Sequence, residues 1–65
     1  MDIGQRLKEA RKRAKITQET AAERIGVSRQ TISNWENNRS YPDILYVIDL
    51  SRLYNISLDE LLKED

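Results

Sequence analysis

With 65 residues, the chain has room for a single small domain. It contains no cysteine and no histidine, so disulfides and the usual thiolate or imidazole zinc sites are excluded, and the core must rest on apolar packing. No apolar run approaches the roughly 20 residues that cross a bilayer. Met1 leads directly into a charged segment that is unlike a signal peptide. We therefore expect a soluble, cytoplasmic protein with no metal and no cofactor.

The formal net charge of 0 conceals two oppositely charged parts of the chain. Residues 1–40 hold nine Lys and Arg against five Asp and Glu, a balance of +4. Residues 41–65 hold two against six, a balance of −4. This asymmetry is typical of a small domain with one face for a polyanion, although a solvated surface of mixed charge would also explain it.

Hydrophobic periodicity predicts helices throughout the chain, and no segment alternates as a strand would. In the first helix, apolar side chains recur at helical spacing, at Ile3, Leu7, Ala10 and Ala14, and Arg11 lies at the edge of this stripe. The five predicted helices lie at about residues 2–15, 17–25, 28–37, 42–54 and 57–63.

The second and third helices are short, and each begins at a hydroxyl residue. Thr17 and Ser28 are favourable N-caps, and Gly26 can adopt the positive φ that ends a helix. In the third helix, Ile32 and Trp35 face one side and predict contact with the core. The opposite side, unusually polar for a purely structural helix, carries Gln30, Ser33 and Asn34, with Arg29 and Thr31 flanking them.

The fourth and fifth helices supply most of the remaining apolar residues. Pro42 is suited to the first position of the fourth helix. This helix is apolar nearly all round, so it is either central to the fold or shared with a partner. The segment from Ser57 to Glu60 has the pattern of a capping box, which predicts the start of the fifth helix.

The order cap, short helix, glycine turn, cap, short helix over residues 17–36 is the design of a helix-turn-helix. This segment resembles the Cro and phage-repressor helix-turn-helix family, also called the xenobiotic-response-element family. The resemblance extends over essentially the whole chain. The matching residues are Thr17, Gln18, Glu19, Ala22, Ile25, Gly26, Val27, Ser28, Ile32, Ser33, Trp35, Glu36 and Asn37, followed by Pro42, Asp43 and the run from Asn55 to Leu62.

The resemblance implies an all-α, compact five-helix bundle of the lambda-repressor-like kind, with residues 1–65 forming one DNA-binding domain. It implies sequence-specific binding of double-stranded DNA by a transcriptional regulator, most simply a repressor, with helix 28–37 in the major groove. Two copies would bind a two-fold symmetric operator with half-sites one helical turn (~34 Å) apart, so we expect a homodimer at least on DNA. Its setting would be a bacterial or phage-type cytoplasm, in association with the nucleoid.

The resemblance also implies roles for individual residues. Arg29, Gln30, Thr31 and Asn34 would contact bases. Their chemistry agrees, because arginine pairs with guanine, amides pair with adenine, and a threonine methyl packs on thymine. The residues expected to contact phosphates are Thr17, Gln18, Ser28, Ser33, Asn37, Arg39 and Ser40.

Two further expectations concern structure rather than DNA contact. The resemblance places Arg11 near Glu36, and because both flank the core stripes it implies a partly buried structural ion pair between them. Ala21 stands where relatives usually carry leucine, which removes core volume. Bulky residues of the last two helices could compensate, or could form a subunit interface. The candidates for that interface are Leu45, Tyr46, Leu53 and Leu58.

Two other classes of function compete with DNA binding. A protein-interaction module could keep the fold without binding DNA, as the neutral total charge and the apolar fourth helix would permit. The polar face of the third helix argues against it, since an apolar contact surface does not need one. An enzyme is disfavoured because, without histidine or cysteine, the commonest general base and the strongest nucleophile are absent.

Overall fold

The computed structural model describes residues 2–63, so Met1, Glu64 and Asp65 of the predicted domain lie outside the described residues. The described part of the chain contains helices and no strand, which confirms the predicted all-α class. The five helices are α1 (Ile3–Arg13), α2 (Gln18–Ile25), α3 (Arg29–Glu36), α4 (Ile44–Leu53) and α5 (Leu58–Leu61).

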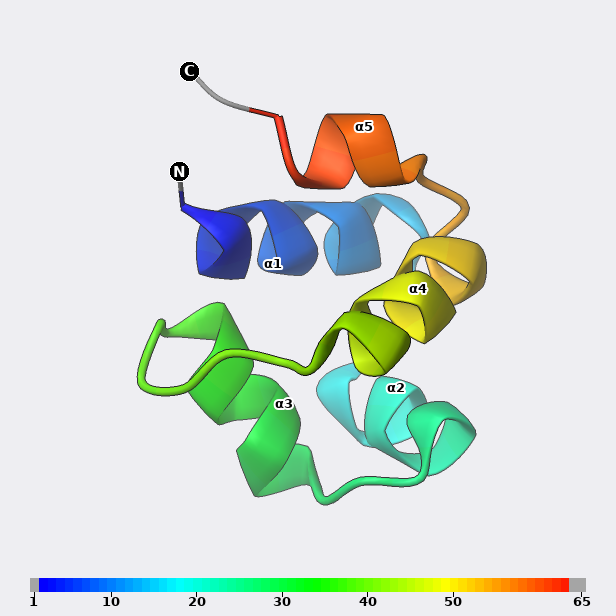
Figure 1. Ribbon diagram of the computed structural model, residues 1–65. Coiled ribbons are helices and arrows are strands. Elements are labelled where there is room, and N and C mark those ends of the chain that lie inside the picture. The colour runs from blue at the N-terminus through cyan, green and yellow to red at the C-terminus, as the bar shows by residue number, and fades with distance from the viewer. Residues whose placement is uncertain (1, 64–65) are drawn as a thin grey trace.

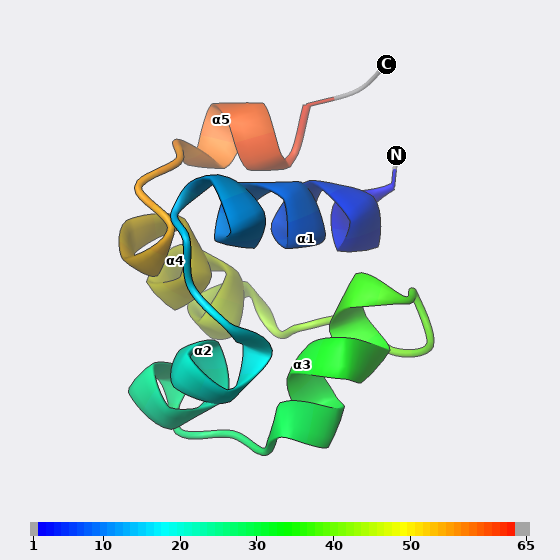
Figure 2. The ribbon, with the colours of Figure 1, turned by 180° about the vertical axis from the view of Figure 1, so that it is seen from behind.

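The helices form two groups that are joined by α4 (Figure 1). α1 and α5 lie side by side on one side of the molecule, and α2 and α3 lie on the other. α1 also packs on α3, and α4 contacts both α2 and α5. Seen from behind, the segment between α1 and α2 crosses from one group to the other (Figure 2). The helix-turn-helix of α2 and α3 therefore occupies one end of the bundle.

Local capping accounts for where most of these helices begin. In each case a side-chain oxygen accepts a hydrogen bond from a backbone N–H of the first turn, which would otherwise be unsatisfied. The four caps are Asp2 for α1, Thr17 for α2, Ser28 for α3 and Ser57 for α5.

α4 begins differently from the expectation. The prediction that Pro42 is its first residue is wrong, because helical structure begins at Ile44. Asp43 is the N-cap, with an extended ψ of 152°, and makes no side-chain capping hydrogen bond. α1 is also shorter than predicted, since it ends at Arg13 and Lys15 turns the chain with a left-handed φ of 60°.

The core receives a large side chain from four of the five helices. Leu7, Ile32, Leu50 and Leu61 are fully buried, and they come from α1, α3, α4 and α5. The second helix contributes small side chains instead, since the buried residues of α2 are alanines. Trp35 closes the core beside Tyr46, with ring centroids 5.4 Å apart and planes tilted by 44°.

The start of α1 is fastened to the segment that follows α3. The Asn38 side-chain oxygen accepts from the Gly4 N–H at 3.1 Å, and its amide nitrogen donates to Asp2 Oδ1 at 2.7 Å. Asn38 is left-handed, with φ 59°. A Cβ on Gly4 would lie 2.6 Å from the Trp35 carbonyl oxygen, so only glycine permits this approach. These contacts fix the loop that carries several of the expected phosphate contacts.

The overall dimensions agree with one small domain. The Cα radius of gyration is 10.4 Å, close to the roughly 11 Å that the size scaling of compact domains gives for this length. Among residues 2–63, no helix has the length and apolar character required to span a membrane. No group of potential metal ligands is present within the same residues.

Candidate nucleic-acid interface

The turn between α2 and α3 has the tight geometry that the sequence predicts. Gly26 ends α2 in the left-handed conformation, with φ 86°. Its N–H and that of Val27 both donate to the Ala22 carbonyl oxygen, at 2.8 and 3.0 Å. Ser28 then caps α3 by accepting from the Thr31 N–H at 3.1 Å. Residues 26–28 thus turn the chain from α2 into α3, which lies at the end of the bundle (Figure 1).

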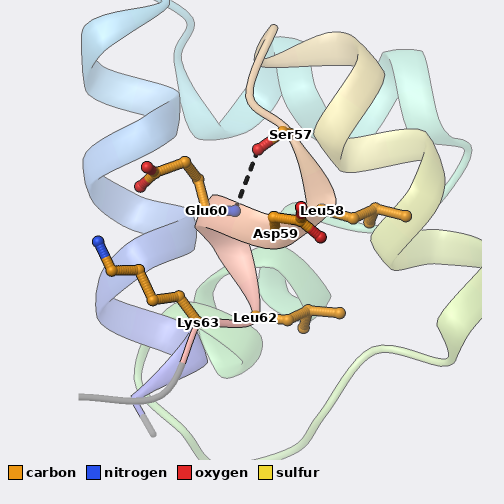
Figure 3. A pocket seen from close by; sticks show the side chains of 6 residues that line it. All are labelled: Ser57, Leu58, Asp59, Glu60, Leu62 and Lys63. Atoms are coloured by element: carbon orange, nitrogen blue, oxygen red, sulfur yellow. Dashed lines mark hydrogen bonds between the residues drawn. The ribbon is translucent and has the colours of Figure 1, made fainter.

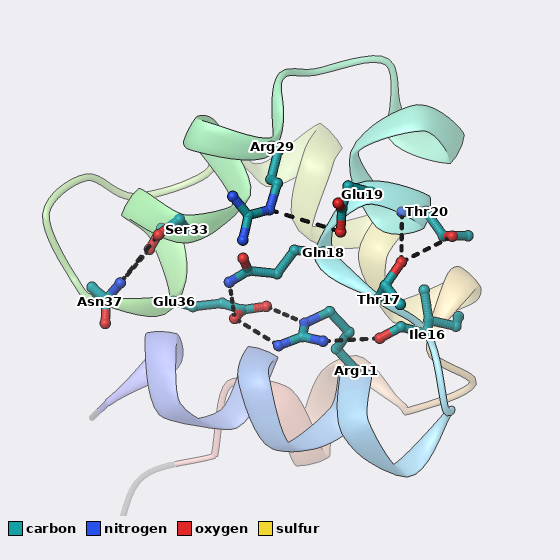
Figure 4. A network of polar contacts seen from close by, with 10 residues as sticks. All are labelled: Arg11, Ile16, Thr17, Gln18, Glu19, Thr20, Arg29, Ser33, Glu36 and Asn37. Atoms are coloured by element: carbon teal, nitrogen blue, oxygen red, sulfur yellow. Dashed lines mark hydrogen bonds and ion pairs between the residues drawn. The ribbon is translucent and has the colours of Figure 1, made fainter.

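A buried ion pair fixes α3 against α1 (Figure 4). Arg11 Nε and Nη2 donate to the two carboxylate oxygens of Glu36, at 2.7 and 3.1 Å. Arg11 Nη1 also donates to the Ile16 carbonyl oxygen at 2.9 Å. The hydrogen bonds to Glu36 raise the pKa of Arg11. Because both side chains lie in the interior, the pair is a buried link between α1 and the end of α3.

Gln18 belongs to the same network. Its Nε2 donates to Glu36 Oε1 at 3.0 Å, so the side chain is directed toward the ion pair (Figure 4). The expected phosphate contact at this position must therefore come from the remaining N–H of that amide or from the free backbone N–H groups of the first turn of α2. The sequence predicted the Arg11–Glu36 pair, but it did not indicate that Gln18 joins it.

The four expected base-contacting residues lie together on the outer face of α3. Arg29 and Gln30 are exposed, and Thr31 and Asn34 are half-buried. Gln30 Nε2 donates to Asn34 Oδ1 at 3.0 Å, which links the two amides one helical turn apart. The Gln30 carbonyl oxygen and the Asn34 amide nitrogen remain available to a base edge. The opposite face of α3 is buried through Ile32 and Trp35.

The expected phosphate-contacting residues flank this face on two sides. Thr17 and Ser28 lie at the starts of α2 and α3 and serve as their caps. Ser33 and Asn37 lie at the other end of α3, where Asn37 Nδ2 donates to the Ser33 carbonyl oxygen at 2.9 Å (Figure 4). The remaining two residues, Arg39 and Ser40, are exposed in the loop that leads to α4.

The candidate interface residues of the last two helices are not equally accessible. Leu45 is 68% exposed, whereas Tyr46, Leu53 and Leu58 are partly buried against the core. Figure 3 shows α5 from close by, where Leu58 and Leu62 project from one side of a surface hollow and Glu60 and Lys63 from the other. Leu45 is therefore the one of the four that is open to a second molecule.

Residues that sequence reasoning passed over also shape this interface. Gly4 and Asn38 hold the loop after α3. The features of the sequence that could have indicated this are a glycine inside a predicted helix and an asparagine just beyond another. Glu19 of α2 lies 3.8 Å from Arg29 of α3, measured from Oε1 to Nε. Nothing local in the sequence joins these two charges, because they belong to different helices.

Comparison with known proteins agrees with this geometry. A family model described as helix-turn-helix matches residues 7–61. The HTH-type transcriptional regulator ImmR of Bacillus subtilis is 45% identical over 65 residues, which make up 100% of this chain and 51% of that protein. The HTH-type transcriptional activator BcrR of Enterococcus faecalis is 36% identical over 62 residues, 95% of this chain and 30% of that protein.

A phage protein is among the relatives as well. Repressor protein C2 of Salmonella phage P22 is 36% identical over 63 residues, which are 97% of this chain and 29% of the repressor. The chain thus spans about half, or less, of the length of these relatives. No solved structure is a significant match. Since the family model covers most of the chain, the chain belongs to the helix-turn-helix family, in its Cro and phage-repressor type.

Proposed function

We propose that the chain binds a specific sequence of double-stranded DNA as the DNA-binding domain of a transcriptional regulator. The observation that carries this proposal is the division of α3 into two faces. Ile32 and Trp35 anchor one face in the core, while Arg29 and Gln30 are exposed on the other. A short helix that is fixed at its back and polar at its front is suited to reading base edges in a major groove.

The flanking residues supply the second requirement of DNA recognition, which is contact with the phosphate backbone of the duplex. Base contacts specify a sequence, and phosphate contacts set the register of the protein on the duplex. The reading face is the outer face of α3 that carries Arg29, Gln30, Thr31 and Asn34. The first turn of α2 and the loop after α3 offer hydroxyl, amide and guanidinium donors on both sides of this face, and Arg39 is exposed. The positive balance of residues 1–40 favours the same face for a polyanion.

We further propose that the chain acts as a repressor on a two-fold symmetric site, through two copies. Repression is the simplest mechanism, since a bound domain blocks its site without any further surface. Tyr41, in the loop before α4, and Ile44 and Leu45, in its first turn, are 71%, 55% and 68% exposed, and a second copy would cover them. Among the relatives, the Salmonella phage P22 protein is named a repressor and the Enterococcus faecalis protein an activator.

Selection of bound sequences from random duplex DNA tests the proposal. We expect a recovered motif with two-fold symmetry and half-sites one helical turn (~34 Å) apart. The affinity for that motif should fall steeply as salt rises, because phosphate contacts release counterions. Recovery of no motif, or binding that is insensitive to salt, would reject DNA recognition and favour a protein-interaction module.

Gln30→Ala tests the assignment of the reading face. It should cost about 1–3 kcal/mol of binding free energy on the selected site and relax preference at one base pair. Gln5→Ala removes the same kind of side chain from the exposed surface of α1 and serves as the matched control. Equal affinities of wild type and Gln30→Ala in a fluorescence titration would show that Gln30 does not contact a base.

A further inference from the structure

An ion pair links the first turns of the two helices of the helix-turn-helix. Glu19 is the second residue of α2, and Arg29 is the first residue of α3. Glu19 Oε1 lies 3.8 Å from Arg29 Nε, and the two side chains are 75% and 63% exposed. The pair therefore lies on the surface that the proposed function turns toward DNA (Figure 4).

We propose that Glu19 is a positioning residue that determines specificity, because it orients Arg29 to read a guanine. This inference rests on the proposed function. It assigns a role in recognition to an acidic side chain that cannot itself favour contact with a phosphate.

The atoms involved in the pair support this role. Glu19 faces the Nε of Arg29, and the two terminal guanidinium nitrogens point away from it (Figure 4). Those two nitrogens form the fork that pairs with the O6 and N7 acceptors of guanine. A long arginine side chain has many rotamers, so a contact that favours one orientation raises the fraction of molecules ready to read the base.

The negative charge of Glu19 also increases sequence preference. A free arginine at the edge of a groove is attracted to the nearest phosphate of any sequence, which strengthens non-specific binding. A carboxylate beside it partly neutralises that attraction and is itself repelled by phosphates. Glu19 thus lowers the affinity for arbitrary DNA more than the affinity for a site with a correctly placed guanine.

Because the pair is exposed, its effect is moderate. Exposed ion pairs are weak and easily broken, so Glu19 biases the orientation of Arg29 without locking it. We expect Glu19→Gln to reduce the preference for the base pair read by Arg29 up to about fivefold, the range that such a pair allows. The same change should increase binding to a scrambled duplex.

The experiment compares base preferences from random-duplex selection for four forms of the protein: wild type, Arg29→Ala, Glu19→Gln and Glu23→Gln. Arg29→Ala identifies the base pair that Arg29 reads. Glu19→Gln should relax preference at that base pair and at no other. Glu23→Gln removes the same charge from an exposed position of the same helix and should leave all preferences unchanged. Adding Glu19→Gln to Arg29→Ala should produce no further change.

Each alternative has its own outcome. If Glu19 only stabilises the start of α2, Glu19→Gln lowers the thermal unfolding midpoint and leaves base preference intact, which overturns the inference. If Glu19→Gln and Glu23→Gln changed base preference equally, the effect would come from the net charge of the domain and not from the ion pair. That result would also overturn the inference. A wild-type motif combined with no effect of Glu19→Gln rejects the inference alone. The absence of any wild-type motif rejects the proposed function with it.

Discussion

Gly4 occupies a position in α1 where the backbone of another helix end comes unusually close. A Cβ there would lie 2.6 Å from the Trp35 carbonyl oxygen and 2.8 Å from that of Glu36. Backbone atoms cannot move aside as a flexible side chain can. We therefore expect Gly4→Ala to lower the free energy of unfolding by about 1–3 kcal/mol, despite the better helix propensity of alanine.

Urea unfolding measures this effect, with Lys12→Ala as the control on an exposed position of the same helix. The control should be neutral or slightly stabilising. A Gly4→Ala protein as stable as wild type would mean that α1 can shift away from the end of α3. That result would remove the reason for a glycine at this position.

Tyr54 makes stability depend on pH in the alkaline range. Burial raises the pKa of its hydroxyl from 10.0 to about 12, and the nearby Glu36 carboxylate adds to the increase. A raised pKa means that the unfolded chain loses this proton first. The corresponding stability is therefore complete below pH 10.0 and is lost as pH rises toward 12. With two pKa units at 1.36 kcal/mol each, the full loss should amount to about 3 kcal/mol.

The comparison of wild type with Tyr54→Phe, by denaturant unfolding at several alkaline pH values, isolates this contribution. Tyr54→Phe should have a smaller decline between pH 10 and 12, while Tyr41→Phe, at an exposed tyrosine, should keep the wild-type decline. Parallel curves for wild type and Tyr54→Phe would assign the alkaline loss to other groups.

At the scale of the elements, the Arg11–Glu36 pair joins α1 to the end of α3, and Gln18 brings α2 into the same network. Arg11→Met leaves a buried carboxylate without its cation and should cost at least about 3 kcal/mol of unfolding free energy. Replacing both partners, as Arg11→Met with Glu36→Leu, removes the uncompensated charge. The double variant should lose less than the sum of the two single variants.

A double-mutant cycle in urea gives this coupling directly. Additive losses would show that the two side chains contribute independently and that the pair does not set the position of α3. Circular dichroism on each variant checks that the helices persist, since the single variants approach the total stability of a small domain.

The boundaries of the elements show which helix signals are reliable. Hydroxyl caps predicted the starts of three helices, because such a cap and its N–H partner lie only three residues apart. Pro42 failed as a start signal because Asp43, the next residue, takes the extended conformation of an N-cap. The left-handed turn at Lys15 was also unforeseen, since a lysine in that conformation has no sequence signature.

At the scale of the whole molecule, the exposed apolar start of α4 predicts self-association on DNA. Leu45→Glu should weaken binding to the two-half-site operator at least about tenfold, because linked half-sites gain affinity from each other. Binding to an isolated half-site should be unchanged. Arg52→Gln makes the same change in charge at an exposed position of α4 and is the control. Anisotropy titrations on both duplexes measure the two affinities, and an equal loss on both would contradict the dimer.

Local signals along the chain were sufficient to predict the helix-turn-helix. Apolar spacing, hydroxyl caps and the positive φ of Gly26 act within a few residues, so they can be read without knowing the fold. The same local rules placed the polar face of α3 opposite Ile32 and Trp35. Five helices, their class and the polar outer face of α3 were therefore predictable.

The hydrogen-bond and ion-pair partners of the polar side chains in that region depend instead on the packing of the whole bundle. Gln18 donates to a carboxylate 18 residues away, and Asn38 holds a backbone N–H 34 residues away. Glu19 pairs with Arg29 across the turn of the helix-turn-helix. Such contacts depend on how helices cross, which core packing sets and local sequence does not encode. The helix-turn-helix could thus be predicted from the chain, but the orientation of the polar side chains around it depends on the assembled bundle.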